Sequence, residues 1–274
     1  MGTFLKKNWF LLGLFCCIVL ALTFPAPGRF LDDHGAKSVS IVLIFFMSGV
    51  SIDTRRAKDD LWRWNAHVLI QTFSFGLFPA MVFWTSFWWL PAGPLKTGVL
   101  LVAVLPTTIS SCVVYTAAAG GRAPCALINA VAGNLLGVVI SPLLLGLLAG
   151  RQGGIDLDSA GKTMVGLCQL VLAPLLAGQV AARLSHWPVK IVGRVQRTAA
   201  PALILLILFC SFCQSAGALR GAVRDIWPVM LYLAAIHIVS VVLAKVCAAA
   251  FELPPDVRPA VVFCATQKTL SLGI

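Results

Sequence analysis

The sequence predicts an all-α protein that crosses a membrane several times. Of its 274 residues, 59% are hydrophobic and only 11% are charged, whereas a soluble domain carries about 25% charged residues. The apolar residues gather in runs whose length approaches the ~20 residues that a helix needs to cross a bilayer. The net charge of +11 does not indicate a nucleic-acid partner, because the basic residues stand in short segments between these runs, where they meet anionic lipid.

Nine apolar segments are expected to span the membrane. Their approximate bounds are 8–25, 38–52, 66–86, 96–118, 124–149, 163–183, 198–218, 228–251 and 258–274. The first is followed by Pro25 and Pro27 rather than a cleavage site, so we interpret it as a retained helix and not as a signal peptide. Lysine and arginine are more frequent on the N-terminal side, which predicts a cytoplasmic N-terminus in a plasma or inner membrane.

The two halves of the chain, residues 1–150 and 151–274, share an order of elements. Each has a short apolar helix, a basic loop that ends in Trp64 or Trp227, a long helix and a polar, broken helix. Repeats with an odd number of helices lie inverted relative to each other in the membrane. The second half is one helix short, so we expect a truncated product that lacks a tenth helix, or less simply a nine-helix protein.

The fourth segment is interrupted by polar residues. Pro106 removes a backbone donor and disfavours the helix, and four hydroxyls and a thiol follow it: Thr107, Thr108, Ser110, Ser111 and Cys112. Carbonyls freed by such a break can coordinate a cation, and the N-terminus of the next half-helix can face an anion. The alternative is an ordinary proline kink whose hydroxyls bond to the preceding turn.

The ninth segment has a matching break. Its polar residues are Thr266, Gln267, Lys268, Thr269 and Ser271. Lys268 is the only charge in the run and lies about 15 Å along a helix from Pro259, close to the middle of the membrane. An ionisable group at that depth indicates a functional site, although a lysine that snorkels to the interface is the alternative.

Neighbouring segments add polar candidates. Asn129 and Asn134 lie in the fifth segment, and Asn134 shares a face with Gly137 and Ser141, where small residues let another helix approach closely. Gln71 lies deep in the third segment on a polar stripe with His67 and Ser74. An asparagine on the face of Asn134 could bond across helices or reach an ion, and Gln71 is a better site candidate than His67, which lies close to the basic loop.

No motif of an enzyme or a metal site is found in the sequence. The charged run from Asp53 to Asp60 is interpreted as a solvated cytoplasmic loop, and the nine cysteines as buried free thiols. We therefore expect no enzymatic activity and no cofactor beyond a coupling ion, Na⁺ or H⁺.

Three motifs carry a resemblance to a known family. Residues 126–143 (ALINAVAGNLLGVVISPL), 173–179 (APLLAGQ) and 264–274 (CATQKTLSLGI) resemble the bile acid:sodium symporter superfamily, in particular its sodium/bile acid cotransporter seven-like branch. The resemblance implies ten helices in two inverted five-helix repeats. Helices four and nine would be broken and would cross in a core domain, while helices one, two, six and seven would form a panel domain.

The resemblance also implies a sodium site near the crossing. The ligands of the better-known symporters map near Ser110, Ser111, Cys112 and Asn134, and Gln71 is the nearest match to a glutamine of helix three. A glutamate of helix nine maps near Cys264, and the glutamine of that stretch falls at Lys268. A fixed ammonium could replace a sodium ion, or it could exchange a proton, since burial disfavours the charged form of lysine.

The sequence therefore predicts a secondary transporter that moves an organic anion by alternating access, with membrane lipid as its other partner. Two alternatives stay open. One is an arsenite-type permease, which Cys112 suggests. The other is a non-transporting regulatory membrane protein that affects cation entry or glycan supply.

Overall fold

The computed structural model describes residues 2–51, 58–90, 93–150, 166, 168–221 and 223–268. Within these ranges the chain is helical and forms no strand, which confirms the predicted all-α class. The extended segments pair once, in an isolated antiparallel bridge between Thr107 and Lys268.

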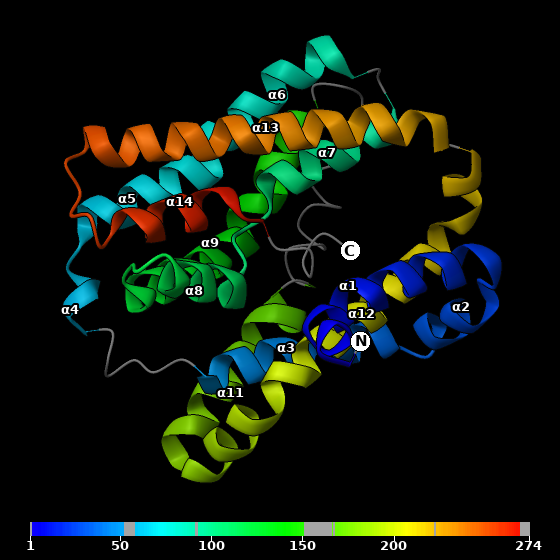
Figure 1. Ribbon diagram of the computed structural model, residues 1–274, viewed down its shortest axis with the longest axis horizontal. Coiled ribbons are helices and arrows are strands. Elements are labelled where there is room, and N and C mark those ends of the chain that lie inside the picture. Colours follow the sequence, from blue (N-terminus) through cyan, green and yellow to red (C-terminus); the bar gives the residue numbers. More distant parts are fainter. Residues whose placement is uncertain are drawn as a thin grey trace. The chain divides into compact units, whose positions relative to one another are not determined.

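The helices follow one another in the order shown in Figure 1. They are α1 (Gly2–Thr23), α2 (Ala26–Asp33), α3 (Ala36–Ser51), α4 (Lys58–Leu61), α5 (Trp64–Thr72), the π-helical turn η1 (Phe73–Leu77), α6 (Phe78–Trp89), α7 (Pro94–Val104), α8 (Ile109–Ala118), α9 (Ala123–Gly150), the π-helical turn η2 (Cys168–Leu172), α11 (Ala173–Leu184), α12 (His186–Gly221), α13 (Val223–Ala250) and α14 (Arg258–Thr266).

The described helices divide into two compact units. Helices α1, α2, α3, α11 and α12 form the first, and α4 to α9, nearly all of α13, and α14 form the second. The first unit thus contains the segments predicted as spans one, two, six and seven, the set expected of a panel domain. The inverted relation between residues 1–150 and 151–274 stays a prediction.

Close backbone contact joins α3 to α11 in the first unit. A side chain at Gly49 would overlap the carbonyl of Leu175, and one at Gly178 would overlap the carbonyl of Phe46. Only glycine permits two helices to approach so closely at both positions. Helix α2 is tied to α12 by a hydrogen bond of 3.1 Å from Arg29 Nε to the carbonyl of Cys213.

Four described helices are long and apolar enough to cross a membrane: Trp64–Trp89, Ala123–Leu148, Thr198–Gly217 and Ile226–Ala250. A fifth span results if Trp9–Thr23 and Ala26–Asp33, which meet at 99°, count as one. Three shorter apolar helices, Ala36–Ser51, Leu95–Val104 and Gln169–Leu184, fall below that length. The chain is thus a helical membrane protein, and the count of nine spans stays a prediction.

One helix bound differs clearly from the sequence prediction, and one agrees with a predicted break. Helix α12 begins at His186 rather than near residue 198, so Lys190, Arg194 and Arg197 lie in the helix and not in a loop. Lysine and arginine are good helix formers and can extend a helix beyond its apolar part. Helix α14 ends at Thr266, where the ninth segment was expected to break, and Gln267 is extended, with ψ 127°.

The two π-helical turns share one sequence context. Each has five residues and is followed by a helix whose second residue is proline, Pro79 after η1 and Pro174 after η2. Proline has no N–H and clashes with the carbonyl one turn earlier, so the main-chain ladder must change there. A π-turn is a local way to accommodate that change, and such turns are frequent at functional sites.

Candidate functional site

The first polar break lies between α7 and α8. Helix α7 ends at Val104, Leu105 is extended, and α8 begins at Ile109. Pro106 packs against α9 at Gly137, where a Cβ would lie 2.9 Å from the proline ring. The predicted close approach at the small-residue face of α9 is thereby confirmed.

Helix α9 satisfies the carbonyls that this break leaves free. Ser141 Oγ donates to the carbonyl of Val104 at 2.6 Å, and Asn134 Nδ2 donates to the carbonyl of Thr107 at 2.8 Å. Asn134 is 2% exposed and Ser141 6% exposed, so these bonds replace water that cannot reach the carbonyls. Of the two functions left open for Asn134, the structure shows the bond across helices.

The second break meets the first. Thr107 forms the antiparallel bridge with Lys268, just after α14 ends. The Thr107 hydroxyl lies 2.7 Å from the carbonyl of Cys264 and 2.6 Å from that of Gln267. Thr107 is 1% exposed. The two polar breaks therefore hold each other through one buried hydroxyl and a short stretch of backbone, beside the adjoining helices α8 and α14 (Figure 1).

Lys268 is held by neutral groups. Its ammonium donates to the carbonyl of Ser74 at 2.8 Å and lies 3.0 Å from the Ser74 hydroxyl. The rings of Phe78 and Phe75 lie 4.8 Å and 5.9 Å away, within the range of cation–π attraction. No carboxylate among the described residues pairs with it. The crossing thus contains a fixed amine without a counter-charge from the described chain.

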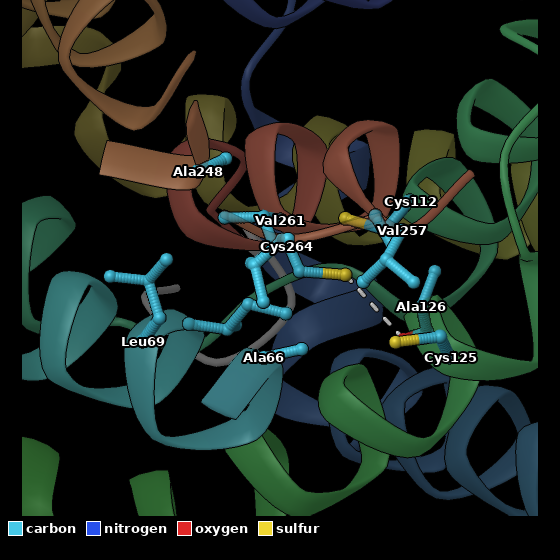
Figure 2. Packing of buried hydrophobic residues seen from close by; sticks show 12 residues of the cluster. Ala66, Leu69, Cys112, Cys125, Ala126, Ala248, Val257, Val261 and Cys264 are labelled. Atoms are coloured by element: carbon cyan, nitrogen blue, oxygen red, sulfur yellow. Dashed lines mark hydrogen bonds between the residues drawn. The ribbon is translucent and has the colours of Figure 1, made fainter. Parts of the chain in front are cut away.

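Two buried thiols line the contact between α8 and α14. Cys112 and Cys264 are both fully buried in an apolar cluster shown in Figure 2, together with Ala66, Leu69 and Val261. Cys112 Sγ donates to the carbonyl of Phe263 at 3.3 Å, and Cys264 Sγ to that of Ala126 at 3.5 Å. Both act as small apolar residues with weak hydrogen bonds, as the sequence predicts, whereas Cys16 is exposed and departs from that prediction.

Gln71 and Asn129 connect α5 to α9. Gln71 Nε2 donates to the carbonyl of Asn129 at 3.0 Å, and its side-chain oxygen faces Gly133. Asn129 is fully buried and bonds to the carbonyl of Cys125 at 2.9 Å. The structure brings these two predicted residues together. Their ability to bind an ion stays a prediction.

The other predicted site residues lie partly near the breaks and partly outside the described residues. Thr108 Oγ1 lies 3.8 Å from Cys112 Sγ, and Ser111 is partly buried in α8. The backbone of Ser110 lies in the first turn of α8. Thr266 Oγ1 donates to the carbonyl of Val262, in its own helix, at 2.8 Å. This local bond is common for a threonine inside a helix and needs no ligand. Thr269 and Ser271 lie outside the described residues.

Sequence reasoning did not select Ser74 as a site residue. Ser74 was seen only as part of a polar stripe, yet its carbonyl and hydroxyl are the partners of Lys268. Its spacing of three from Gln71 was the available signal. The spacing of the polar residues does not predict the π-turn that aims this carbonyl at the amine.

One sequence interpretation is wrong. Asp60 was assigned to a solvated loop, but it is 1% exposed. Arg63 Nε lies 2.9 Å and Arg122 Nε 2.8 Å from its carboxylate, and Arg122 also reaches Asp256 at 3.4 Å. A carboxylate tolerates burial when paired in this way. The bonds to Asp60 raise the pKa of the Arg122 guanidinium above its ordinary value.

Comparisons with known proteins identify the class of protein to which this site belongs. The sequence profile of the SBF-like CPA transporter family (DUF4137) matches residues 8–274. The chain therefore belongs to this transporter family, whose members are transporters and not enzymes.

Individual relatives agree with that membership. The chain is 30% identical to "Uncharacterized protein PA2026" of Pseudomonas aeruginosa, over 99% of this chain and 82% of the relative. It is 29% identical to "Putative symporter YfeH" of Escherichia coli, over 97% and 81%. It is 27% identical to "Sodium/bile acid cotransporter 7" of Mus musculus, over 98% and 82%. The chain is thus similar to bile acid:sodium symporter-like transporters.

Proposed function

We propose that the protein is a secondary active transporter that moves an organic anion by alternating access, with the anion bound at the crossing of the two polar breaks. The observation that carries the proposal is the Lys268 ammonium, which is held by a carbonyl, a hydroxyl and two aromatic rings. A cation held only by neutral partners leaves its charge available to an anionic ligand. A relative named as a bile acid cotransporter makes a steroid or other organic carboxylate a suitable first probe.

The same lysine supports a proposal about coupling. A cation fixed to the chain supplies positive charge at the crossing, so a bound sodium ion is not needed to balance the substrate. The proposed transporter therefore works without sodium, and proton exchange at Lys268 is the alternative form of coupling.

Uptake by proteoliposomes tests both proposals. Purified protein would be reconstituted and given radiolabelled taurocholate in sodium-free potassium buffer, with a panel of unlabelled organic carboxylates and sulfonates as competitors. Wild-type protein should accumulate the label above protein-free liposomes, and sodium should not increase the rate. Lys268→Ala should lower uptake at least about tenfold, the effect of losing ~1.4 kcal/mol of interaction with the anion.

Lys245→Ala is the matched control. Lys245 is an exposed lysine of α13 that is remote in sequence from the breaks, so its loss removes the same charge without touching the crossing. Its uptake should stay close to wild type. Equal uptake by the Lys268→Ala and wild-type proteins would contradict the binding role. A folded protein that accumulates no label, and binds none of the competitors in a thermal-shift assay, would contradict transport of organic anions.

The two alternative functions gain no specific support. The thiol of Cys112 is fully buried and donates to the carbonyl of Phe263, so no described contact favours an arsenite-type permease. A regulatory membrane protein would show no substrate flux, and the same uptake measurement separates it from a transporter.

A further inference from the structure

The partner of Lys268 is the backbone carbonyl of Ser74. This carbonyl has no main-chain donor, and the reason lies in the sequence around Ser74. In an α-helix the carbonyl of Ser74 would accept from the N–H of residue 78. Here the N–H of Phe78 donates instead to the carbonyl of Phe73, as a π-turn requires. The Ser74 carbonyl has therefore lost its α-helical donor.

The next possible donor is absent for a chemical reason. If the π-pattern continued by one residue, the carbonyl of Ser74 would accept from residue 79, which is proline and has no N–H. A buried carbonyl without a partner is unfavourable at membrane depth. Ser74 is 2% exposed, and the ammonium of Lys268 supplies the missing donor at 2.8 Å.

We propose that Pro79 is the positioning residue for Lys268, because it leaves the Ser74 carbonyl without a main-chain donor and so creates the acceptor that fixes the ammonium at the crossing. Pro79 itself touches no ligand in this scheme. The inference rests on the proposed function only for its consequence, namely that the fixed ammonium serves an anionic substrate. The contact between the lysine and the carbonyl stands on the geometry alone.

The chain contains its own control. Pro174 follows the π-turn η2 with the same spacing, as the second residue of α11. Its replacement restores an N–H in the same local context, but Lys268 bonds to Ser74 and not to η2. If replacing any proline in a membrane helix had the same effect, the Pro79 and Pro174 variants would behave alike. An effect that acts through Lys268 will appear only when Pro79 is replaced.

A double-mutant cycle in detergent-solubilised protein tests the proposal without a substrate. Lys268→Met should lower the melting temperature of the wild-type protein, because it leaves the Ser74 carbonyl unsatisfied. In a Pro79→Ala background the new N–H can donate to this carbonyl. The decrease in melting temperature that Lys268→Met causes should therefore be smaller by about half or more. In a Pro174→Ala background, Lys268→Met should decrease the melting temperature by as much as it does in the wild-type background. Equal losses in all three backgrounds would overturn the proposal.

Lysine reactivity gives an independent readout. Reductive methylation of the native protein, resolved by mass spectrometry, should modify Lys268 faster in Pro79→Ala than in wild type, with the exposed Lys245 as internal reference. Pro79→Ser, which restores the same N–H, should behave alike and replaces Pro79→Ala if that variant does not fold. Unchanged reactivity in the folded variant would overturn the proposal. Slow, Pro79-dependent methylation together with absent uptake would contradict the proposed function and leave the positioning role intact.

Discussion

Thr107 is the residue on which the contact between the two breaks depends most directly. Its hydroxyl reaches two carbonyls of the other break, and its own carbonyl accepts from Asn134. A hydroxyl has one hydrogen to donate, so the two acceptors share it. The residue joins three segments that lie apart in the sequence, which makes it a structural link, and its role as an ion ligand stays a prediction.

Replacement of Thr107 by valine tests this link. Valine keeps the shape but removes the hydroxyl, so the carbonyls of Cys264 and Gln267 lose their donor, and we expect a destabilisation of about 1–3 kcal/mol. The midpoint of unfolding in detergent measures it. Thr266→Val is the control, because that buried hydroxyl bonds only to a carbonyl of its own helix and should cost clearly less. Similar costs for the two variants would contradict the role of Thr107.

Single residues also show what the sequence could and could not predict. Pro106 is followed by a run of hydroxyls and Lys268 stands among other polar residues, so both breaks were visible from residue types. Asp60 was misjudged because a charged run looks solvated until its partners are known, and Arg122 lies 62 positions away. The direction of the Ser74 carbonyl depends on the π-turn. Pro79 marks this turn in the sequence, but the sequence does not show which group the freed carbonyl meets.

At the scale of elements, the Asp60 pairing joins α4 to two loops of the second unit. Arg122 stands between α8 and α9, and both its backbone N–H and its side chain reach Asp256, before α14. Its side chain also binds Asp60, in α4. The hydrogen bonds to Asp60 raise the pKa of the Arg122 guanidinium above its ordinary value, so the guanidinium stays charged and its contribution to stability is lost only at extreme alkaline pH.

Arg122→Ala should therefore destabilise the second unit. The variant leaves the buried carboxylate of Asp60 with one arginine instead of two, and since Arg122 is itself 35% exposed, we expect a cost of about 1–3 kcal/mol rather than that of a fully buried pair. Detergent unfolding at neutral pH measures this cost. Arg258→Ala is the matched control, because its Nε bonds only to the nearby carbonyl of Leu253. An equal or larger loss on Arg258→Ala would contradict the special role of Arg122.

At the scale of the whole molecule, the helical class and the polar breaks could be predicted from the sequence more accurately than the helix bounds. Apolar composition decides the class, and it is a sum over many residues that local errors do not change. The ends of α12 and α14 depend on where basic side chains and the second break allow a helix to continue, which is a matter of tertiary context. The orientation in the membrane is likewise a global property, set by the distribution of lysine and arginine.

The N-terminus is predicted to face the cytoplasm. The loops expected on the same side of the membrane as the N-terminus carry more lysine and arginine than the loops on the other side. A protease site fused before Met1 should then be cut in inside-out vesicles and protected in right-side-out vesicles. A second site inserted after Gly154, in the expected loop between the fifth and sixth segments, should show the opposite pattern. Cleavage of both sites from the same side would mean that an even number of spans separates them, and the expected five would be wrong.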